Sequence, residues 1–217
     1  MTDNIAHDLR SPLARVRAIS ESMLSTDNTH QEYKSAASDT IEECDRLLQM
    51  INSILDVAEA EAGAFQTPKQ KVNIHQLVQD ACELFEAMAE QKCIKLVCRL
   101  ENKCYIYGNI QNLQRMLANL LDNAIKYTLE NGQVDVVLTC IQQEIKIIVM
   151  DTGMGIPEND QTRVFDRFFR CDQSRTHDGC GLGLSFSRAV AHSHGGDINL
   201  SSRLKKGSCF TIKLPTT

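Results

Sequence analysis

Apolar residues recur at three- and four-residue steps through residues 1–61. The stripe consists of Ile5, Leu9, Leu13, Val16 and Met23 in the first half, and of Ile41, Leu47, Leu48, Ile51, Ile54, Leu55 and Ala58 in the second. Between the halves, residues 25–30 (STDNTH) are polar and rich in helix-capping types. The pattern predicts two amphipathic helices joined by a turn. A lone hairpin cannot bury both stripes, so we expect a homodimer in which two hairpins form a four-helix bundle.

The pattern changes after residue 61. Residues 62–71 (AGAFQTPKQK) contain Gly63 and Pro68 and show no periodicity. We therefore expect a linker over 62–70 and a second domain over 71–217. In that domain, helices are predicted at 75–91, 109–127 and up to about residue 194, and strands at 94–100, 104–107, 133–140, 145–151, 197–201 and 209–214. Interspersed helices and strands predict an α/β sandwich with a mixed sheet, which makes the whole chain α+β.

Composition narrows the function classes. The 217 residues are 42% hydrophobic and 24% charged, as in ordinary globular proteins, and the formal net charge is −5. An acidic chain lacks the basic footprint of a nucleic-acid-binding protein. No apolar run approaches the roughly 20 residues that span a bilayer, and the polar start does not resemble a signal peptide. Any membrane attachment would come from upstream segments.

The nine cysteines include no Cys-x-x-Cys pair, and their number is odd. Both facts disfavour a zinc site and a closed disulfide framework. Most lie in apolar or strand-like runs, which favours a reducing compartment, the cytoplasm. Cys171 and Cys180 fall in a polar, glycine-bearing loop, where we interpret them as incidental exposed thiols rather than redox sites. The His192-x-His194 pair lacks acidic or cysteine partners at ligand spacing, so we interpret it as structural.

Three polar residues share one face of the helix predicted at 109–127. Asn119, Asn123 and Lys126 are spaced by four and three residues. Asparagine is a poor helix former, so two on one stripe call for a reason. An amide oxygen is a suitable ligand for Mg²⁺, and a lysine beside it can meet phosphate. The alternative is a solvated helix face, and the segment alone does not decide between them.

Two glycine-bearing segments follow. Residues 151–155 (DTGMG) come directly after a strand-like run, where Asp151 could accept a hydrogen bond from the amine of adenine, although an ordinary tight turn would look the same. Residues 179–185 (GCGLGLS) open a helix, and glycines before a helix N-terminus expose N–H groups to an anion such as phosphate. This segment matches neither a Walker loop nor a Rossmann fingerprint.

Taken in order, five segments resemble the N, G1, F, G2 and G3 boxes of histidine-kinase catalytic domains. They are NLLDNAIKYT (119–128), DTGMGIP (151–157), FDRFFR (165–170), GCGLGLS (179–185) and GSCF (207–210). That domain belongs to the ATPase superfamily shared with Hsp90, type II topoisomerases and MutL. The resemblance implies an α/β sandwich that holds ATP and Mg²⁺ under a lid at about 156–182.

The same resemblance implies roles for individual residues. Asn123 would ligate magnesium, Asp151 would read adenine, and Arg170 would help to engage the phosphoacceptor helix. The ATP-binding set implied is Asn119, Asn123, Lys126, Tyr127, Asp151, Gly153, Gly155, Gly181, Leu182 and Gly183.

Residues 4–18 (NIAHDLRSPLARVRA) resemble the H box of the largest histidine-kinase family. His7 would be the phosphoacceptor, two residues from both Ile5 and Leu9 and so directed away from the apolar stripe. The Asp8 carboxylate could take the other ring proton as His7 attacks. Without the downstream boxes, a lone surface histidine before the proline at position 12 would be the better interpretation.

One residue departs from the family pattern. Ser11 stands four positions after His7, where the family usually has Thr or Asn, and this puts phosphatase activity in doubt. His7 is preceded by six residues, so we expect an excised transmitter, the cytoplasmic part of a sensor whose upstream segments decide whether it is membrane-bound.

The resemblance implies ATP-dependent autophosphorylation of His7, followed by transfer to an aspartate of a response-regulator receiver domain. One rival is a catalytically weak scaffold that regulates another kinase by dimerisation. The presence of His7, Asp8, Asn123 and Asp151 disfavours it. A second rival is a non-kinase ATPase of the same superfamily, which would lack the histidine-bearing hairpin.

Overall fold

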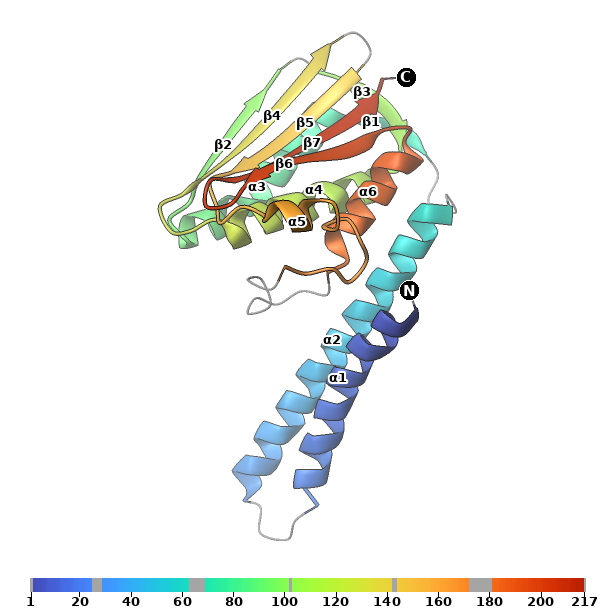
Figure 1. The fold of residues 1–217 in the computed structure, drawn as a ribbon, viewed down its shortest axis with the longest axis vertical. Coiled ribbons are helices and arrows are strands. Elements are labelled where there is room, and N and C mark those ends of the chain that lie inside the picture. The colour runs from blue at the N-terminus through green and yellow to red at the C-terminus, as the bar shows by residue number, and fades with distance from the viewer. Residues whose placement is uncertain are drawn as a thin grey trace. The chain divides into compact units, whose positions relative to one another are not determined.

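The computed structural model describes residues 2–24, 29–62, 69–101, 103–141, 144–171 and 181–216. The chain forms two compact units, residues 1–56 and 57–217. Each unit is described by itself below. The helical hairpin and the α/β sandwich with a mixed sheet, both predicted from the hydrophobic pattern, are confirmed (Figure 1).

The hairpin consists of α1 (Thr2–Ser22) and α2 (His30–Ala62). Thr29 begins α2 through a capping box, because the Thr29 backbone N–H donates to Glu32 Oε2 at 2.6 Å and the Glu32 N–H donates to Thr29 Oγ1 at 3.3 Å. His30 is therefore the first residue of the helix rather than part of the predicted turn. The rest of that turn, residues 25–28, lies outside the described residues.

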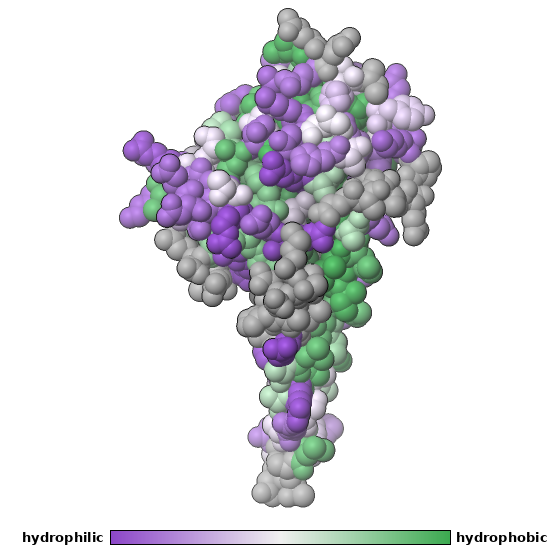
Figure 2. All heavy atoms as spheres, turned by 45° about the vertical axis from the view of Figure 1, so that its right-hand side comes forward, coloured by the Kyte–Doolittle hydropathy of each residue, from purple (hydrophilic) through white to green (hydrophobic). Residues whose placement is uncertain are grey.

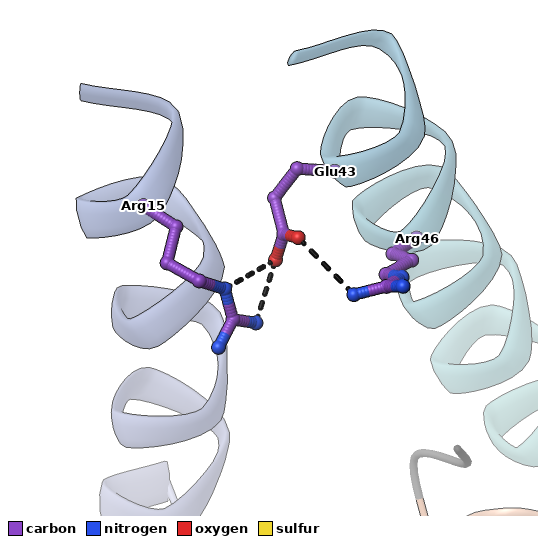
Figure 3. Close-up of polar contacts among 3 residues, drawn as sticks. All are labelled: Arg15, Glu43 and Arg46. Atoms are coloured by element: carbon purple, nitrogen blue, oxygen red, sulfur yellow. Dashed lines mark hydrogen bonds and ion pairs between the residues drawn. The ribbon is translucent and has the colours of Figure 1, made fainter. Parts of the chain in front are cut away.

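A buried carboxylate joins the two helices of the hairpin. Nε and Nη2 of Arg15 donate to Oε1 of Glu43 at 2.9 and 2.6 Å, and Nη1 of Arg46 lies 3.4 Å from Oε2 (Figure 3). Glu43 is only 5% exposed. A carboxylate removed from water needs charged partners, and the two arginines supply them.

Much of the apolar stripe stays exposed in the single chain. Among its described large side chains, five are between 43% and 62% exposed: Leu13, Ile41, Leu48, Ile51 and Leu55. Figure 2 shows apolar side chains gathered along the hairpin. Protein surfaces ordinarily expose apolar side chains singly, whereas here several lie along one hairpin.

The second unit has two layers, a five-stranded sheet and a layer of helices beneath it (Figure 1). Its elements are β1 (Gln70–Asn73), α3 (Ile74–Gln91), β2 (Lys95–Leu100), β3 (Tyr105–Gly108), α4 (Ile110–Tyr127), β4 (Gln133–Ile141), β5 (Glu144–Asp151), α5 (Glu158–Gln161), α6 (Gly183–Ser193), β6 (Asp197–Arg203) and β7 (Gly207–Pro215). The sheet order is β2-β4-β5-β7-β6, with β2 and β4 parallel and the other pairs antiparallel. Strands β1 and β3 form a separate antiparallel pair.

The core follows from the periodicity of each element. On β5 and β7 mostly alternate residues are buried, on β4 the buried apolar residues are Val134, Val136 and Leu138, and α4 buries seven residues along one face. The buried α4 residues are Leu113, Met116, Leu117, Leu120, Leu121, Ala124 and Ile125. A fully buried aliphatic side chain contributes about 1.5–3 kcal/mol, so this face fixes α4 against the sheet.

Most predicted boundaries are within two residues of those observed, and two elements were missed. Asn73 and Asn109 are N-caps, and their side chains accept from the backbone N–H groups of Gln76 and Asn112. Helix α4 therefore begins one residue after the predicted start. Strand β1 and helix α5 were not predicted, because β1 buries only Val72 and α5 buries no residue, so neither shows a hydrophobic period.

Candidate functional site

Asp151 is the last residue of β5 and is 7% exposed. Its Oδ1 accepts hydrogen bonds from the backbone N–H groups of Gly153 at 2.8 Å and Ser208 at 3.2 Å. Within the described part of the chain, no hydrogen bond reaches Oδ2. Burial raises the pKa of the Asp151 carboxyl above its usual value, and the two N–H donors oppose that rise. The two donors fix the plane of the carboxylate and tie β5 to the start of β7.

The backbone around Asp151 leaves no room for side chains at two glycines. A Cβ at Gly153 would lie 2.2 Å from the carbonyl oxygen of Tyr127. A Cβ at Gly207 would lie 1.8 Å from the carbonyl oxygen of Asp151, and the φ of Gly207 is +94°. The Gly207 turn, which begins the segment 207–210, is therefore packed directly against the Asp151 backbone.

Helix α4 places the predicted Asn and Lys residues beside two other segments. Asn119 Nδ2 donates to the carbonyl oxygen of Gly183 at 3.2 Å, which joins α4 to the first turn of α6. The N–H of Met154 donates to the Tyr127 carbonyl at 3.1 Å, which joins the end of α4 to the segment after β5. Asn123 and Lys126 are half-exposed on the same helix, and Lys126 Nζ lies 5.7 Å from the centroid of the Tyr127 ring.

The predicted lid is described only in part, because residues 172–180 lie outside the described residues. One hydrogen bond joins the two flanks of that segment, because the Phe168 N–H donates to the Gly181 carbonyl at 2.9 Å. Gly181 has φ +67°, and a Cβ there would lie 2.8 Å from the carbonyl carbon of Phe168. Arg170 is half-exposed, Leu182 is 3% exposed at the start of α6, and Gly155 has φ +67°.

Lys92 also belongs to this region, although no pattern in the sequence points to it. Its Nζ donates to the carbonyl oxygens of Ile125 and Lys126, both at 3.1 Å. These carbonyls belong to the last turn of α4, where a cation satisfies groups that the helix itself leaves unpaired. The signal was absent because Lys92 follows a different helix, 33 and 34 positions earlier in the chain.

The phosphoacceptor residues of the prediction, His7, Asp8 and Ser11, belong to α1. Their side chains are outside the described part of the structure. Among the described residues, no group of three or more His, Cys, Asp or Glu side chains could hold a metal ion. None of the described helices combines the length and apolarity needed to cross a bilayer.

Four segments are thus joined by hydrogen bonds around Asp151 and α4. Asp151 contacts residues 153 and 208, Tyr127 contacts residue 154, and Asn119 contacts residue 183. A buried carboxylate beside closely packed backbone can read the edge of a flat base. Amides, a lysine and a glycine-bearing helix start can meet an anion.

Comparison with protein-family models gives two matches. Residues 108–217 match the family described as histidine kinase-, DNA gyrase B-, and HSP90-like ATPase. Residues 1–63 match the family described as His Kinase A (phospho-acceptor) domain. The two matches correspond to the predicted catalytic and phosphoacceptor regions.

The chain is also similar to individual proteins, and the solved structures among them match its fold. The chain is 38% identical over 218 residues to the sensor histidine kinase RppB of Synechocystis sp., covering 99% of this chain and 48% of that protein. The crystal structure of histidine kinase ThkA in complex with response regulator protein TrrA matches all of this chain and 61% of that one, with TM-score 0.77 and 24% identity. Full-length ShkA in complex with AMPPNP matches 98% of this chain and 45% of that one, with TM-score 0.73 and 24% identity. This chain thus spans about half the length of the curated relative.

Proposed function

This chain belongs to the histidine kinase-, DNA gyrase B- and HSP90-like ATPase family and carries a histidine-kinase phospho-acceptor domain, and from that premise we propose that it is a protein-histidine kinase. It transfers the γ-phosphoryl group of ATP to His7 and then passes it to an aspartate of a response regulator. The ThkA complex with its response regulator supports the second step, as a property of a related fold.

The observation that carries the proposal is the orientation of the Asp151 carboxylate by the N–H groups of Gly153 and Ser208. With Oδ1 held by these donors, Oδ2 accepts the exocyclic amine of adenine. Guanine has a carbonyl oxygen at the same ring position, which a carboxylate repels. The carboxylate therefore selects ATP over GTP.

Residues of α4 and the start of α6 meet the phosphates. The Asn123 amide oxygen fits Mg²⁺ as one hard neutral ligand, since Mg²⁺ is commonly bound by few protein groups together with substrate phosphates. Bound there, the ion would neutralise phosphate charge. Lys126 and the backbone N–H groups at Gly181, Leu182 and Gly183 interact with phosphate oxygens.

Phosphoryl transfer is largely a matter of positioning and charge stabilisation. One ring nitrogen of His7 attacks the γ-phosphorus, and the bond from phosphorus to the β–γ bridging oxygen breaks. Asp8 accepts the proton of the other ring nitrogen, and Arg170 engages the phosphoacceptor helix. The receiver-domain carboxylate then attacks the phosphorus, and the bond from phosphorus to the ring nitrogen breaks. As it breaks, Asp8 returns the proton to the other ring nitrogen, so His7 is released as neutral imidazole. The Ser11 hydroxyl is the candidate group for orienting the water that hydrolyses the phosphorylated aspartate of the partner in a phosphatase reaction.

A second copy of the chain is the partner for the exposed apolar stripe of the hairpin. Leu13, Ile41, Leu48, Ile51 and Leu55 are each more than two-fifths exposed in the single chain, and a four-helix bundle would cover them. Light scattering over a dilution series tests this. A strict monomer at high concentration, with the hairpin still helical, would overturn the dimer.

A labelled-ATP assay tests the kinase activity. The unmodified chain should acquire acid-labile, base-stable label, His7→Gln should acquire none, and His30→Gln should be labelled normally as the matched control in the same hairpin. Label that persists in His7→Gln would assign the phosphoacceptor elsewhere.

The magnesium ligand is tested separately. Asn123→Ala should remove the effect of magnesium on nucleotide affinity, and a full magnesium effect in that variant would exclude Asn123 as the ligand.

A further inference from the structure

Lys92 pairs two carbonyl groups at the end of α4. A helix leaves its last four carbonyl oxygens, here those of residues 124–127, without a partner inside the helix. The Lys92 ammonium donates to two of them, those of Ile125 and Lys126, each at 3.1 Å. A cation at a helix C-terminus also interacts favourably with the helix dipole. One side chain from α3 therefore holds half of the carbonyl groups in the last turn of α4.

The other two carbonyl groups of this turn are also paired. The Ala124 carbonyl accepts from the Thr128 hydroxyl at 2.6 Å, and the Tyr127 carbonyl accepts from the Met154 N–H at 3.1 Å. A Cβ at Gly153 would lie 2.2 Å from the same Tyr127 oxygen, so the segment that follows β5 packs directly on the turn. Movement of the last turn of α4 would therefore also move the backbone of that segment.

The connection between α3 and β2 fixes the position from which Lys92 reaches α4. Lys92 is the C-cap of α3, and the next residue, Cys93, has φ +54°. The Cys93 carbonyl accepts from the Asn131 N–H at 3.0 Å, and the Lys95 N–H donates to the Gly132 carbonyl at 2.9 Å. Backbone bonds thus join this connection to the segment that follows α4. The Lys92 side chain adds the bonds to α4 itself.

We propose that Lys92 is a positioning residue of the nucleotide site. It acts through α4, by holding the last turn in the conformation that presents Lys126 and Tyr127 to the nucleotide. Without the ammonium, two carbonyls lose their donor, and the turn spends less time in that conformation. Apparent affinity falls with the fraction of molecules in the binding-competent conformation. The inference rests on the function proposed above, in which Lys126 meets the phosphates of ATP.

Titration calorimetry of the full chain with ATP tests the proposal. Lys92→Met keeps the aliphatic stem and removes the ammonium, so ATP should bind about tenfold more weakly, the loss expected for a hydrogen bond from a charged group. Lys92→Arg keeps a cation with several donors and should recover most of the affinity. Lys95→Met is the matched control, because it removes the same charge from another exposed lysine nearby, and it should bind ATP normally.

Labelling kinetics and thermal unfolding separate positioning from folding. Because Lys92 acts through α4 and has no contact with the reacting atoms, Lys92→Met should raise the KM for ATP about tenfold and leave the rate at saturating ATP unchanged. The fold should persist, since Lys92 is exposed and replaces no buried side chain. The melting temperature of each variant checks this independently of nucleotide.

A Lys92→Met chain with a lower melting temperature and unchanged ATP affinity would overturn the proposal, since Lys92 would then only stabilise the fold. Equal losses of affinity in Lys92→Met and Lys95→Met would also overturn it, because the lost charge alone would explain them. So would a Lys92→Arg chain as weak as Lys92→Met. An unmodified chain that binds no ATP would overturn the proposed function as well, so the unmodified chain tells the two failures apart.

Discussion

Arg15 in α1 donates two hydrogen bonds to Oε1 of Glu43 in α2, across 28 positions of sequence. The relationship is asymmetric, because the side chain of Glu43 is 7% exposed whereas that of Arg15 is 57% exposed. Removing Arg15 would leave the buried carboxylate with only the longer contact to Arg46, at 3.4 Å. Replacing both Arg15 and Glu43 with apolar residues of similar size would leave no buried charge short of partners.

We therefore expect Arg15→Ala to destabilise the hairpin by about 1–2 kcal/mol, a figure reduced from that of a fully buried pair because the arginine is exposed. Hydrogen exchange of α1 and α2 amides measures the loss. Arg17→Ala, which removes the exposed pair with Glu21 in the same helix, should cost only about 0.3–0.5 kcal/mol. Equal exchange rates in the two variants would show that the Glu43 contact does not stabilise the hairpin.

Replacing Asp151 with asparagine should weaken ATP binding by about 2–4 kcal/mol, because a charge-assisted acceptor is lost and an amide donor can face the donor amine of adenine. The fold should persist, since the remaining amide oxygen still accepts from the Gly153 and Ser208 N–H groups. Titration calorimetry measures the affinity. Asp80→Asn, an exposed carboxylate on α3, is the control and should bind ATP normally. Unchanged affinity in Asp151→Asn would remove this residue from the nucleotide site.

The raised pKa of Asp151 predicts opposite effects of acid on binding and on stability. As pH falls through this raised pKa, the carboxylate that accepts the adenine amine is protonated, so ATP affinity should fall. Because burial disfavours the charged form, the folded unit takes up that proton more readily than the unfolded chain. The free energy of unfolding should therefore gain from this group as pH falls from the raised pKa towards the ordinary value. Asp151→Asn should lose both dependences, and their survival in that variant would assign them to another group.

The titration of His194 should change the free energy of unfolding with pH in the opposite direction to that of Asp151. Its Nε2 accepts from the Asn109 N–H at 3.1 Å, so the ring proton is on Nδ1, which donates to the Val190 carbonyl at 2.7 Å. Burial, with a smaller effect of the Lys69 charge, lowers the pKa of His194, and the Val190 bond opposes this. Protonation would cost Asn109 its acceptor.

The contribution of His194 to stability should be complete above its unfolded pKa of 6.5 and should be lost as pH falls from there through its lowered folded value. Urea unfolding of the chain at about pH 8 and about pH 5.5 measures this. His194→Gln should be less stable at the higher pH and should show a smaller loss on acidification. His30→Gln, at the exposed start of α2, should follow the unmodified chain. A His194→Gln variant with the full loss would exclude this residue as the cause.

The sequence predicts individual helices and strands better than it predicts the contacts between them. Along β5 and β7 burial mostly alternates from one residue to the next, so the sequence of each strand predicts it to within two residues of its ends. Strand β1 has four residues and depends on pairing with β3, which lies more than 30 positions later, so no local signal marks it. A local pattern records how a segment is buried but not which segment it meets.

The same limit applies to the site. Asp151 was predicted from its own segment, but its bond to the Ser208 N–H spans 57 positions and needs the register of β5 with β7. The contact of Lys92 with α4 has no signal in the sequence for the same reason, since it depends on how the end of α3 packs against α4. The family resemblance identified candidate residues, whereas their hydrogen-bond partners required the structure.

Gly207 offers the sharpest steric test of how this region is held together. A Cβ at Gly207 would lie 1.8 Å from the Asp151 carbonyl oxygen, whereas the nearest atom to a Cβ at Gly195 would be Pro215 Cγ at 3.4 Å. Both glycines have positive φ, +94° and +75°, so alanine at either position has a backbone cost of about 1 kcal/mol.

Only Gly207→Ala must also push apart β7 and the end of β5, which should cost about 1–3 kcal/mol more, as overpacking does in protein cores. Because the displaced backbone includes Asp151 and the Ser208 N–H, ATP affinity should fall together with the melting temperature. In Gly195→Ala the melting temperature should fall less and ATP affinity should be unchanged. Thermal unfolding and calorimetry of the two variants measure these effects. If Gly207→Ala bound ATP as tightly as Gly195→Ala, the link between the Gly207 turn and the orientation of Asp151 would be disproved.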